Sequence, residues 1–221
     1  MKPDAKKALL AAAVLAVQCA GTGWLVWRYE NIVRNGTEVR FDCTAYDPYD
    51  PLRGRYLRAT VDGICTNLLP RADGESWKQT YGAAVFAKLE QGTNAIWQIT
   101  AVSDGIPDDG GLWIKPESAI VDHSVQRWED GETREEYDKR RTASPFVARV
   151  FMPGRLFVNE RLAPAAEKIL REATSATGKK SVAVYRAKGG EIVITDIEID
   201  GESVLALARA AERSRGGDAA R

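Results

Sequence analysis

The residues best suited to chemistry lie in one short loop, Asp47–Tyr56, which reads Asp-Pro-Tyr-Asp-Pro-Leu-Arg-Gly-Arg-Tyr. The carboxylates of Asp47 and Asp50 could supply oxygen ligands to a cation, and Arg53 could add a guanidinium to a cleft. The same residues also suit a rigid turn, because Asp side chains cap turns, proline fixes φ and a guanidinium bridges carboxylates. The loop is therefore either a site or a turn, and the turn is the simpler interpretation.

Elsewhere the chain offers little catalytic machinery. One His and three Cys argue against a zinc site with several ligands. His123 and Ser124 are neighbours on a predicted strand, so their side chains point to opposite faces and cannot form a nucleophile–base pair. A dyad of Lys78 with Ser144 or Ser76 remains open as a covalent mechanism, but nothing around these residues supports it. We therefore predict no metal site and no cofactor.

Two cysteines form a candidate disulfide, Cys43 with Cys65. Both belong to a segment that we expect outside the membrane, where disulfides persist, and both have the parity of their strands' apolar face. Simple hairpin pairing would place Cys43 near Arg58, so a bridge requires a bent strand or a bulge. The alternative is two buried thiols.

Aromatic and charged side chains give two weaker hypotheses. Trp77, Trp97, Trp113 and Trp128 could stack on a ligand, but tryptophans in a core are commoner. The charged run 129–141 could dock a partner, but such runs are more often solvated faces. The run could form a short helix or a loop.

Two strings of residues resemble a known family. The block Asp-Pro-x-Asp-Pro-Leu-Arg-Gly-x-Tyr, with Gly54 and Tyr56, resembles the signature of the GDYXXLXY family of membrane-anchored proteins, and Gly154–Glu160 is similar to its C-terminal half. The chain departs from the family's Asp, Leu and Tyr at Arg55, Ala59 and Val61. The resemblance covers residues 36–201. It implies a membrane-anchored architecture, and no activity is established for the family.

The N-terminus predicts a membrane anchor. Three lysines, Lys2, Lys6 and Lys7, precede an uncharged run, Ala8–Trp27, whose length of about 20 residues is what a membrane-spanning helix needs. Trp24, Trp27 and Tyr29 cluster at its far end, where aromatic rings favour the interface. A cleaved signal peptide is the alternative, but its apolar region is usually shorter, and Gln18-Cys19-Ala20 is a poor cleavage site.

Beyond the anchor, the pattern favours an α+β domain that is rich in antiparallel strands and has one packed helix. Segments Val39–Ala45 and Tyr56–Val61 alternate apolar and polar residues and predict a hairpin. Residues 83–88 and 95–102 predict two more strands, and 181–185 with 191–199 predict a closing hairpin over Gly189-Gly190. Leu162, Ala166, Ile169, Leu170 and Ala173 predict the packed helix by their helical spacing.

Together these features predict residues 1–7 in the cytoplasm, an anchor at 8–28, an exported domain at 36–201, and a short helix with a disordered tail at 202–221. Lysine plus arginine equals aspartate plus glutamate at 31 each, so no nucleic-acid partner is expected. The function we favour is non-enzymatic, an interaction or assembly module at the outer face of the cytoplasmic membrane. It would contact the lipid bilayer through residues 8–28 and a membrane-protein partner. The alternatives are a hydrolase or a small-ligand sensor that uses the Asp47–Tyr56 loop.

Overall fold

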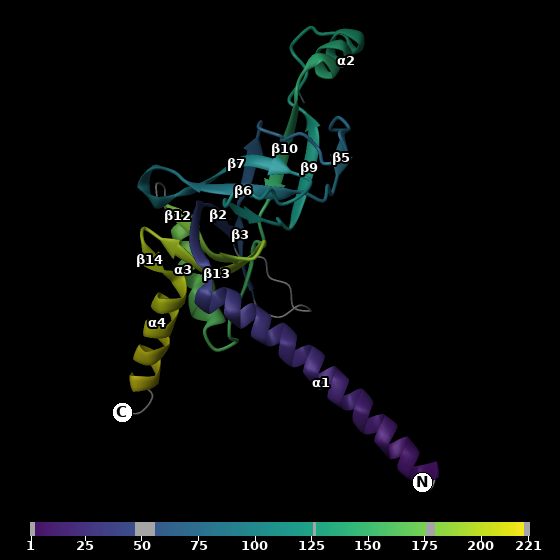
Figure 1. The fold of residues 1–221 in the computed structure, drawn as a ribbon. Helices are drawn as coiled ribbons and strands as arrows, with labels where there is room; N and C mark the ends of the chain where they lie inside the picture. The colour runs from purple at the N-terminus through teal and green to yellow at the C-terminus, as the bar shows by residue number, and fades with distance from the viewer. Residues whose placement is uncertain (1–2, 47–55, 126, 176–179, 219–221) are drawn as a thin grey trace.

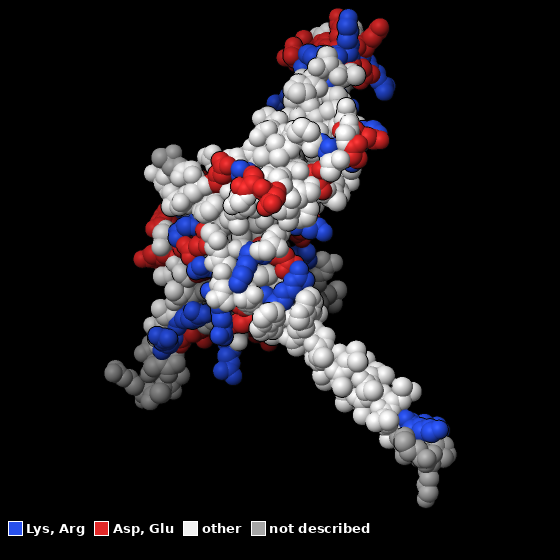
Figure 2. Space-filling model, in the orientation of Figure 1, with Lys and Arg blue, Asp and Glu red and all other residues white. Residues whose placement is uncertain are grey.

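The computed structural model describes residues 3–46, 56–125, 127–175 and 180–218, and its first element is a long helix that stands away from the domain (Figure 1). Helix α1 (Pro3–Asn35) has 33 residues, and at about 1.5 Å per residue its length is about 50 Å. Its segment Lys6–Asn35 is long and apolar enough to cross a membrane, and its most apolar window is entirely unburied. Figure 2 shows the middle of this helix as uncharged surface between blue side chains at its free end and the charged domain.

The described residues after α1 form four antiparallel sheets with a few helices, so the predicted α+β class is confirmed. The sheet that contacts α1 has the order β1-β12-β13-β14, with strands β1 (Thr37–Asp42), β12 (Ser181–Lys188), β13 (Glu191–Ile199) and β14 (Glu202–Ser203). The predicted closing hairpin is β12–β13. Gly189 and Gly190 have φ of 59° and 84°, the positive values that a tight two-residue hairpin turn requires.

Two pairs of consecutive strands, each with a bend between its members, join the lower part of the domain, beside α1, to the upper part (Figure 1). On one side β3 (Tyr56–Thr60) continues into β4 (Asp62–Cys65), and on the other β10 (Phe146–Phe151) continues into β11 (Arg155–Phe157). Below the bend the sheet order is β11-β3-β2, with β2 (Thr44–Tyr46). Above it the order is β4-β10-β9-β5, with β9 (Ser118–His123) and β5 (Thr80–Tyr81).

The remaining sheet has the order β7-β6-β8, with β6 (Phe86–Gln91), β7 (Trp97–Ser103) and β8 (Leu112–Ile114). The short 3-10 helix Thr93–Ala95 connects β6 to β7. The two strands that the sequence predicts at 83–88 and 95–102 are therefore present, with boundaries shifted by one to three residues, an ordinary uncertainty. Buried residues from all four sheets form one core, and Leu57, Leu89, Ile114 and Tyr185 are its largest fully buried side chains.

The first predicted strand divides at Cys43. Before it, Val39 and Phe41 are buried in β1, which pairs with β12 rather than with β3. After it, β2 pairs with β3, so the predicted hairpin holds only for this half, with Tyr46 opposite Arg58. The simple hairpin that would place Cys43 near Arg58 does not form, because the chain changes sheets at Cys43, whose backbone N–H donates to the carbonyl of Ser181 at 3.0 Å.

Two helices, α3 (Ala163–Ser175) and α4 (Val204–Asp218), pack on the sheets beside α1. Helix α3 carries the predicted apolar face, with Ala166, Leu170 and Ala173 buried. Helix α4 packs against α3 and β13. Val204 and Ala208 are buried one helical turn apart and join the helix to the core, in the segment 202–221 for which a short helix followed by a disordered tail was predicted.

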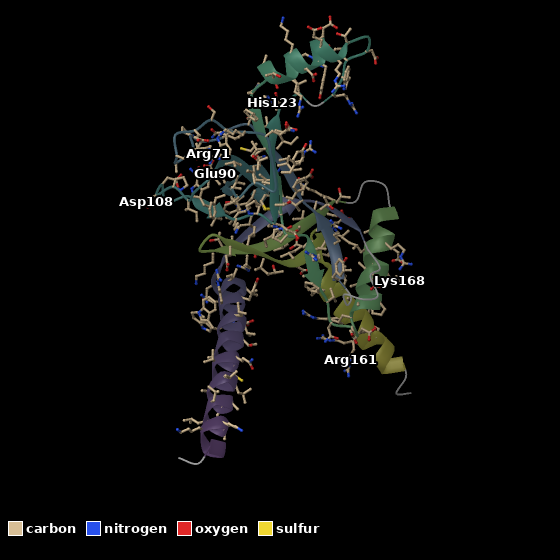
Figure 3. All side chains as sticks on the ribbon, turned by 90° about the vertical axis from the view of Figure 1, so that its right-hand side faces the viewer. Arg71, Glu90, Asp108, His123, Arg161 and Lys168 are labelled. Carbon is tan, nitrogen blue, oxygen red and sulfur yellow. The ribbon has the colours of Figure 1, made fainter. Side chains whose placement is uncertain are left out.

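The charged run between β9 and β10 forms a projecting arm at the end of the domain opposite α1 (Figure 1). Its helix α2 (Arg134–Ala143) begins with a capping box, in which the Thr133 side chain accepts from the backbone of Glu136 and the Glu136 carboxylate accepts from Thr133. This arrangement satisfies the free N–H groups of a helix start. His123 lies at the base of the arm, whereas Arg161 and Lys168 mark the opposite end beside α3 (Figure 3).

Candidate functional site

Strand β3, which begins at the last residue of the first string, lies beside β11, which belongs to the second string, although the two are far apart in the sequence. Strand β3 follows the Asp47–Tyr56 loop, β11 follows Gly154, and the two strands pair antiparallel. Arg155 is opposite Arg58, and Phe157 is opposite Tyr56. The fold therefore makes one surface from β3 and β11.

Gly154 lets strands β3 and β11 approach each other closely at the bend. A Cβ atom at this position would lie 2.3 Å from the backbone oxygen of Ala59, closer than real Cβ contacts. In its absence, the Ala59 N–H donates to the carbonyl of Gly154 at 2.9 Å, and the Met152 N–H donates to the carbonyl of Val61 at 3.1 Å. A side chain at residue 154 would break this contact between β3 and β11.

The two faces of the β3–β11 pair differ in character. Leu57, Ala59 and Leu156 are buried in the core. Because side chains alternate along a strand, Arg58 and Arg155 share the other face, with the rings of Tyr56 and Phe157 beside them at a centroid distance of 6.0 Å. Phe157 is 67% exposed, whereas Tyr56 is only 9% exposed. This face therefore combines cationic groups with an uncovered ring.

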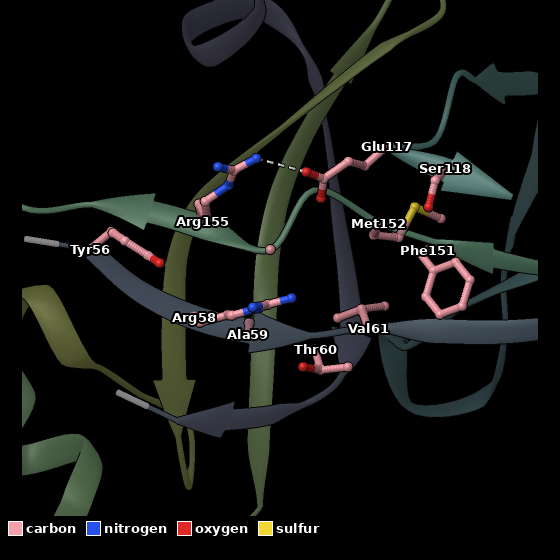
Figure 4. A pocket seen from close by; sticks show the side chains of 11 residues that line it. Tyr56, Arg58, Ala59, Thr60, Val61, Glu117, Ser118, Phe151, Met152 and Arg155 are labelled. Carbon is pink, nitrogen blue, oxygen red and sulfur yellow. Dashed lines mark hydrogen bonds and ion pairs between the residues drawn. The ribbon is translucent and has the colours of Figure 1, made fainter. Parts of the chain in front are cut away.

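A carboxylate from a third element balances part of this charge. Like charges directly opposite each other destabilise a strand pair, and Arg58 faces Arg155. Glu117, just before β9, accepts a hydrogen bond from Nη2 of Arg155 at 3.0 Å (Figure 4). Both side chains of this ion pair are nearly half exposed, so the pair is open to a competing ligand.

Two cavities meet at the Arg155–Glu117 ion pair. The motif groove, of about 540 Å³, is lined by Tyr56, Arg58, Thr60 and Ser118 together with the ion pair (Figure 4). The junction pocket, of about 530 Å³, is lined by Tyr29 of α1, Lys115, Phe157 and Glu191 together with the ion pair. Both cavities are large enough for a small-molecule ligand.

The groups that line these cavities suit binding better than bond cleavage. Guanidinium and ammonium groups recognise carboxylates and phosphates, and Thr60 and Ser118 add hydroxyls to the motif groove. The motif groove has no His, Cys or Lys among its lining residues. Among the residues that the structure describes, no group of three metal-ligating side chains could hold a metal ion. The arrangement can bind an anionic group.

The structure describes only one of the predicted residues of the Asp47–Tyr56 loop. Asp47, Asp50, Arg53 and Gly54 lie outside the described residues. Tyr56 is the first residue of β3 and lines the motif groove. The predicted choice between a site and a turn therefore stays open for the four loop residues.

The candidate disulfide is not formed in the structure, where Cys43 and Cys65 are free thiols. Cys43 is half-buried, and burial, assisted by the neighbouring carboxylate of Asp42, raises the pKa of its thiol to about 12. Cys65 is buried opposite Ala148, and burial raises the pKa of its thiol as well. Both thiols therefore pack as small apolar side chains.

The remaining candidates have structural partners. The His123 ring stacks on Phe146 with centroids 4.3 Å apart, and its Nδ1 lies 2.9 Å from the carbonyl oxygen of Ser144. The Ser144 hydroxyl donates to the carbonyl of Arg141. Lys78 pairs with Glu75 at 2.8 Å. None of these contacts forms a nucleophile–base pair.

The tryptophans take up different environments. Trp113 is buried, and its indole N–H donates to the carboxylate of Asp109 at 2.8 Å. The indole N–H of Trp77 donates to the backbone carbonyl of Leu69 at 2.9 Å. Trp97 packs against the core. Trp128 is 49% exposed and stacks on Tyr137 of the projecting arm, with the ring centroids 4.7 Å apart. A surface cluster of these four residues is therefore absent.

Sequence reasoning missed four residues that line the two cavities, namely Arg58, Lys115, Glu117 and Arg155. Both arginines stand inside strings that resemble the family, so a pairing of β3 with β11 would have identified them. Lys115 and Glu117 lie in the connection from β8 to β9. No periodicity or motif marks that connection.

Comparison with known proteins gives one match. A family model described as GDYXXLXY protein matches residues 18–197. The matched part includes the end of α1, both strings and the two cavities. No significant match is found among curated proteins or among solved structures.

Proposed function

Since the chain belongs to the GDYXXLXY family, we propose that it is a single-pass protein of the cytoplasmic membrane whose exported domain acts as an interaction or assembly module. In this proposal residues 1–7 are cytoplasmic, residues 8–28 are the anchor and the domain from residue 36 onward lies outside. The anchor pairs with a helix of a membrane-protein partner. The domain then presents the motif groove at the outer face of the membrane.

One observation carries the proposal, an amide side chain at the middle of an uncovered apolar helix. Gln18 lies at the centre of the run Ala8–Trp27, and no residue of this run is buried by the rest of the described chain. A polar side chain is costly in the middle of a bilayer and usually faces another protein group. Amide side chains in membrane helices form hydrogen bonds across helix pairs, worth about 0.6 to 2 kcal/mol.

The join between α1 and the domain supports a role in positioning. Arg28 donates to the carboxylate of Glu191, and Lys188 donates to Asn31 at 3.1 Å. Ile32 is 3% exposed against the domain. A helix fixed in this way holds the domain in one orientation, as a module that presents a surface to a neighbour requires.

Photocrosslinking in intact membranes tests the partner. A photoreactive residue in place of Val14 lies on the same helix face as Gln18, whereas one in place of Ala16 lies on the opposite face. We expect a covalent adduct of higher mass from position 14, little from position 16, and loss of the adduct when Gln18→Leu is added. An adduct that persists in the Gln18→Leu variant, or one that contains only two copies of this chain, would contradict the proposal.

A reporter fusion tests the orientation. Three lysines precede the apolar run, and such a bias keeps the N-terminus in the cytoplasm. Alkaline phosphatase fused after Arg221 should be active, because the reporter works only when exported. The purified protein should begin at Met1 or Lys2. An inactive fusion would refute the orientation, and a new N-terminus near Gly21 would show a cleaved signal peptide instead of an anchor.

A further inference from the structure

We infer that the junction pocket binds the phosphate headgroup of an anionic phospholipid from the outer leaflet of the membrane. The inference rests on the membrane placement in the proposed function, and it adds a ligand that is independent of the protein partner. It follows from three observations, namely the height of the pocket along α1, its charges and its uncovered ring.

The height of the pocket follows from the helix that lines it. Tyr29 lies two residues beyond Trp27, where the apolar run ends, so it lies about 3 Å further along the axis. The headgroup layer extends about 5 to 7 Å beyond the hydrocarbon on each side. Tyr29 is also a lining residue of the junction pocket. The pocket therefore opens within the headgroup layer when the run spans the bilayer.

The charges favour an anion. Lys115 and Arg155 line the pocket with the carboxylates of Glu117 and Glu191. Each carboxylate already has a guanidinium partner, because Glu117 pairs with Arg155 at 3.0 Å and Glu191 pairs with Arg28. Lys115 is exposed, and no carboxylate of the described chain forms an ion pair with its ammonium group. When Arg28, which neutralises Glu191 from outside the pocket lining, is counted, three cations face two carboxylates, and the excess of one positive charge matches the single charge of a phosphodiester.

The rim of the pocket suits the apolar part of a lipid. Phe157 lines the pocket and is 67% exposed, an unusual position for a ring in water. On α1, Trp24 and Trp27 are 55% and 63% exposed just below Tyr29. A phosphate held by Lys115 would leave its acyl chains free to lie along this aromatic surface and the apolar run. A soluble phosphate ester would use the cations and leave the rings uncovered.

The experiment uses the full chain in a neutral detergent, titrated with phosphatidylglycerol and followed by native mass spectrometry. Lys115→Gln should bind the first lipid about tenfold more weakly, as expected for the loss of one charge-assisted contact. Lys115→Glu should weaken binding further. Lys180→Gln is the matched control, because Lys180 lines a separate cavity of about 550 Å³, and it should bind as the natural chain does.

Two further ligands distinguish the sources of phosphate. Phosphatidylcholine should bind more weakly than phosphatidylglycerol, and glycerol phosphate, which lacks acyl chains, should bind much more weakly than either. Equal affinity for glycerol phosphate would overturn the lipid assignment in favour of a soluble ester, and unchanged binding by both Lys115 variants would overturn the pocket. Lipid binding in detergent depends neither on a protein partner nor on the side of the membrane on which the domain lies. Its outcome can therefore be told apart from the outcomes of the crosslinking and of the fusion.

Discussion

Replacing Gly154 with alanine should destabilise the domain by about 2 kcal/mol. The new Cβ would lie 2.3 Å from the backbone oxygen of Ala59 and 3.5 Å from its carbonyl carbon. These are backbone atoms that cannot rotate away as a side-chain tip can, so β3 and β11 must separate. Overpacking of this kind costs about 1–3 kcal/mol.

Two further effects partly cancel. Separation of the strands weakens the hydrogen bond from the Ala59 N–H to the carbonyl of Gly154, now 2.9 Å long, at a cost of about 1 kcal/mol. Alanine also restricts the unfolded chain, which returns about 0.4–1 kcal/mol. The net loss of about 2 kcal/mol corresponds to a fall in Tm of about 4–8 °C for a domain of this size.

The measurement is thermal unfolding of the full chain in detergent, followed by far-ultraviolet circular dichroism. Gly105→Ala is the matched control, because a Cβ at Gly105 meets nothing within 4 Å and its Tm should stay within about 2 °C. A Tm for Gly154→Ala equal to that of the Gly105 variant would refute the argument. In that case the bend between β3 and β11 would be soft enough to admit a methyl group.

Three other predictions test separate parts of the structure. Ile32→Ala, at a position only 3% exposed, should lower the free energy of unfolding by about 3 kcal/mol in a urea titration, and a loss below 1 kcal/mol would contradict the docking of α1. Because both thiols are free, Cys43 and Cys65 should resist iodoacetamide at pH 8 in the native chain. Once the chain is unfolded without reductant, both should react together with Cys19, whereas a single reactive thiol, that of Cys19, would indicate a disulfide between the other two. The pKa of Asp109 is lowered from 3.8 to about 2, first by the hydrogen bond from Lys88, so ionised Asp109 stabilises the folded state above about pH 4 and this contribution is lost as the pH falls toward 2. Asp109→Asn should flatten the fall of Tm over that pH interval, and an unchanged slope would rule out this cause.

Local patterns predicted the elements that local physics determines. The β12–β13 hairpin could be predicted because Gly189-Gly190 supplies the two positive φ values that its turn needs. The face of α3 could be predicted because Ala166, Leu170 and Ala173 are spaced by three and four residues. In both cases the signal lies within about ten residues of chain.

Helix α4 owes its position to contacts that its own sequence does not reveal. Its C-terminal half is rich in Arg, Glu and Gly, which resembles a solvated tail. Its packing depends on Val204 and Ala208, and an alanine gives only a weak apolar signal. The helix forms because α3 and β13 are there to cover, and this information lies elsewhere in the sequence.

The candidate site could not be assembled from the sequence for a similar reason. The pairing of Arg58 with Arg155 depends on the register of two strands that are far apart in the sequence. Lys115 and Glu117 reach the same place through the connection between β8 and β9, where the N–H of Lys115 donates to the carbonyl of Gly190 at 2.7 Å. A long-range contact of this kind has no periodicity along the chain.

In the proposed arrangement, in which α1 spans the membrane, its unbroken passage into the domain makes the protein responsive to bilayer thickness. An apolar span that is too long for a thin membrane tilts, and a thicker membrane lets it stand upright. Because Ile32 and the Arg28–Glu191 contact tie the helix to the sheet, a change of tilt rotates the whole domain with it. In that arrangement the arm that carries α2, at the far end of the molecule from α1 (Figure 1), moves through the widest arc, so that a local change in lipid thickness displaces a part of the protein far from the membrane.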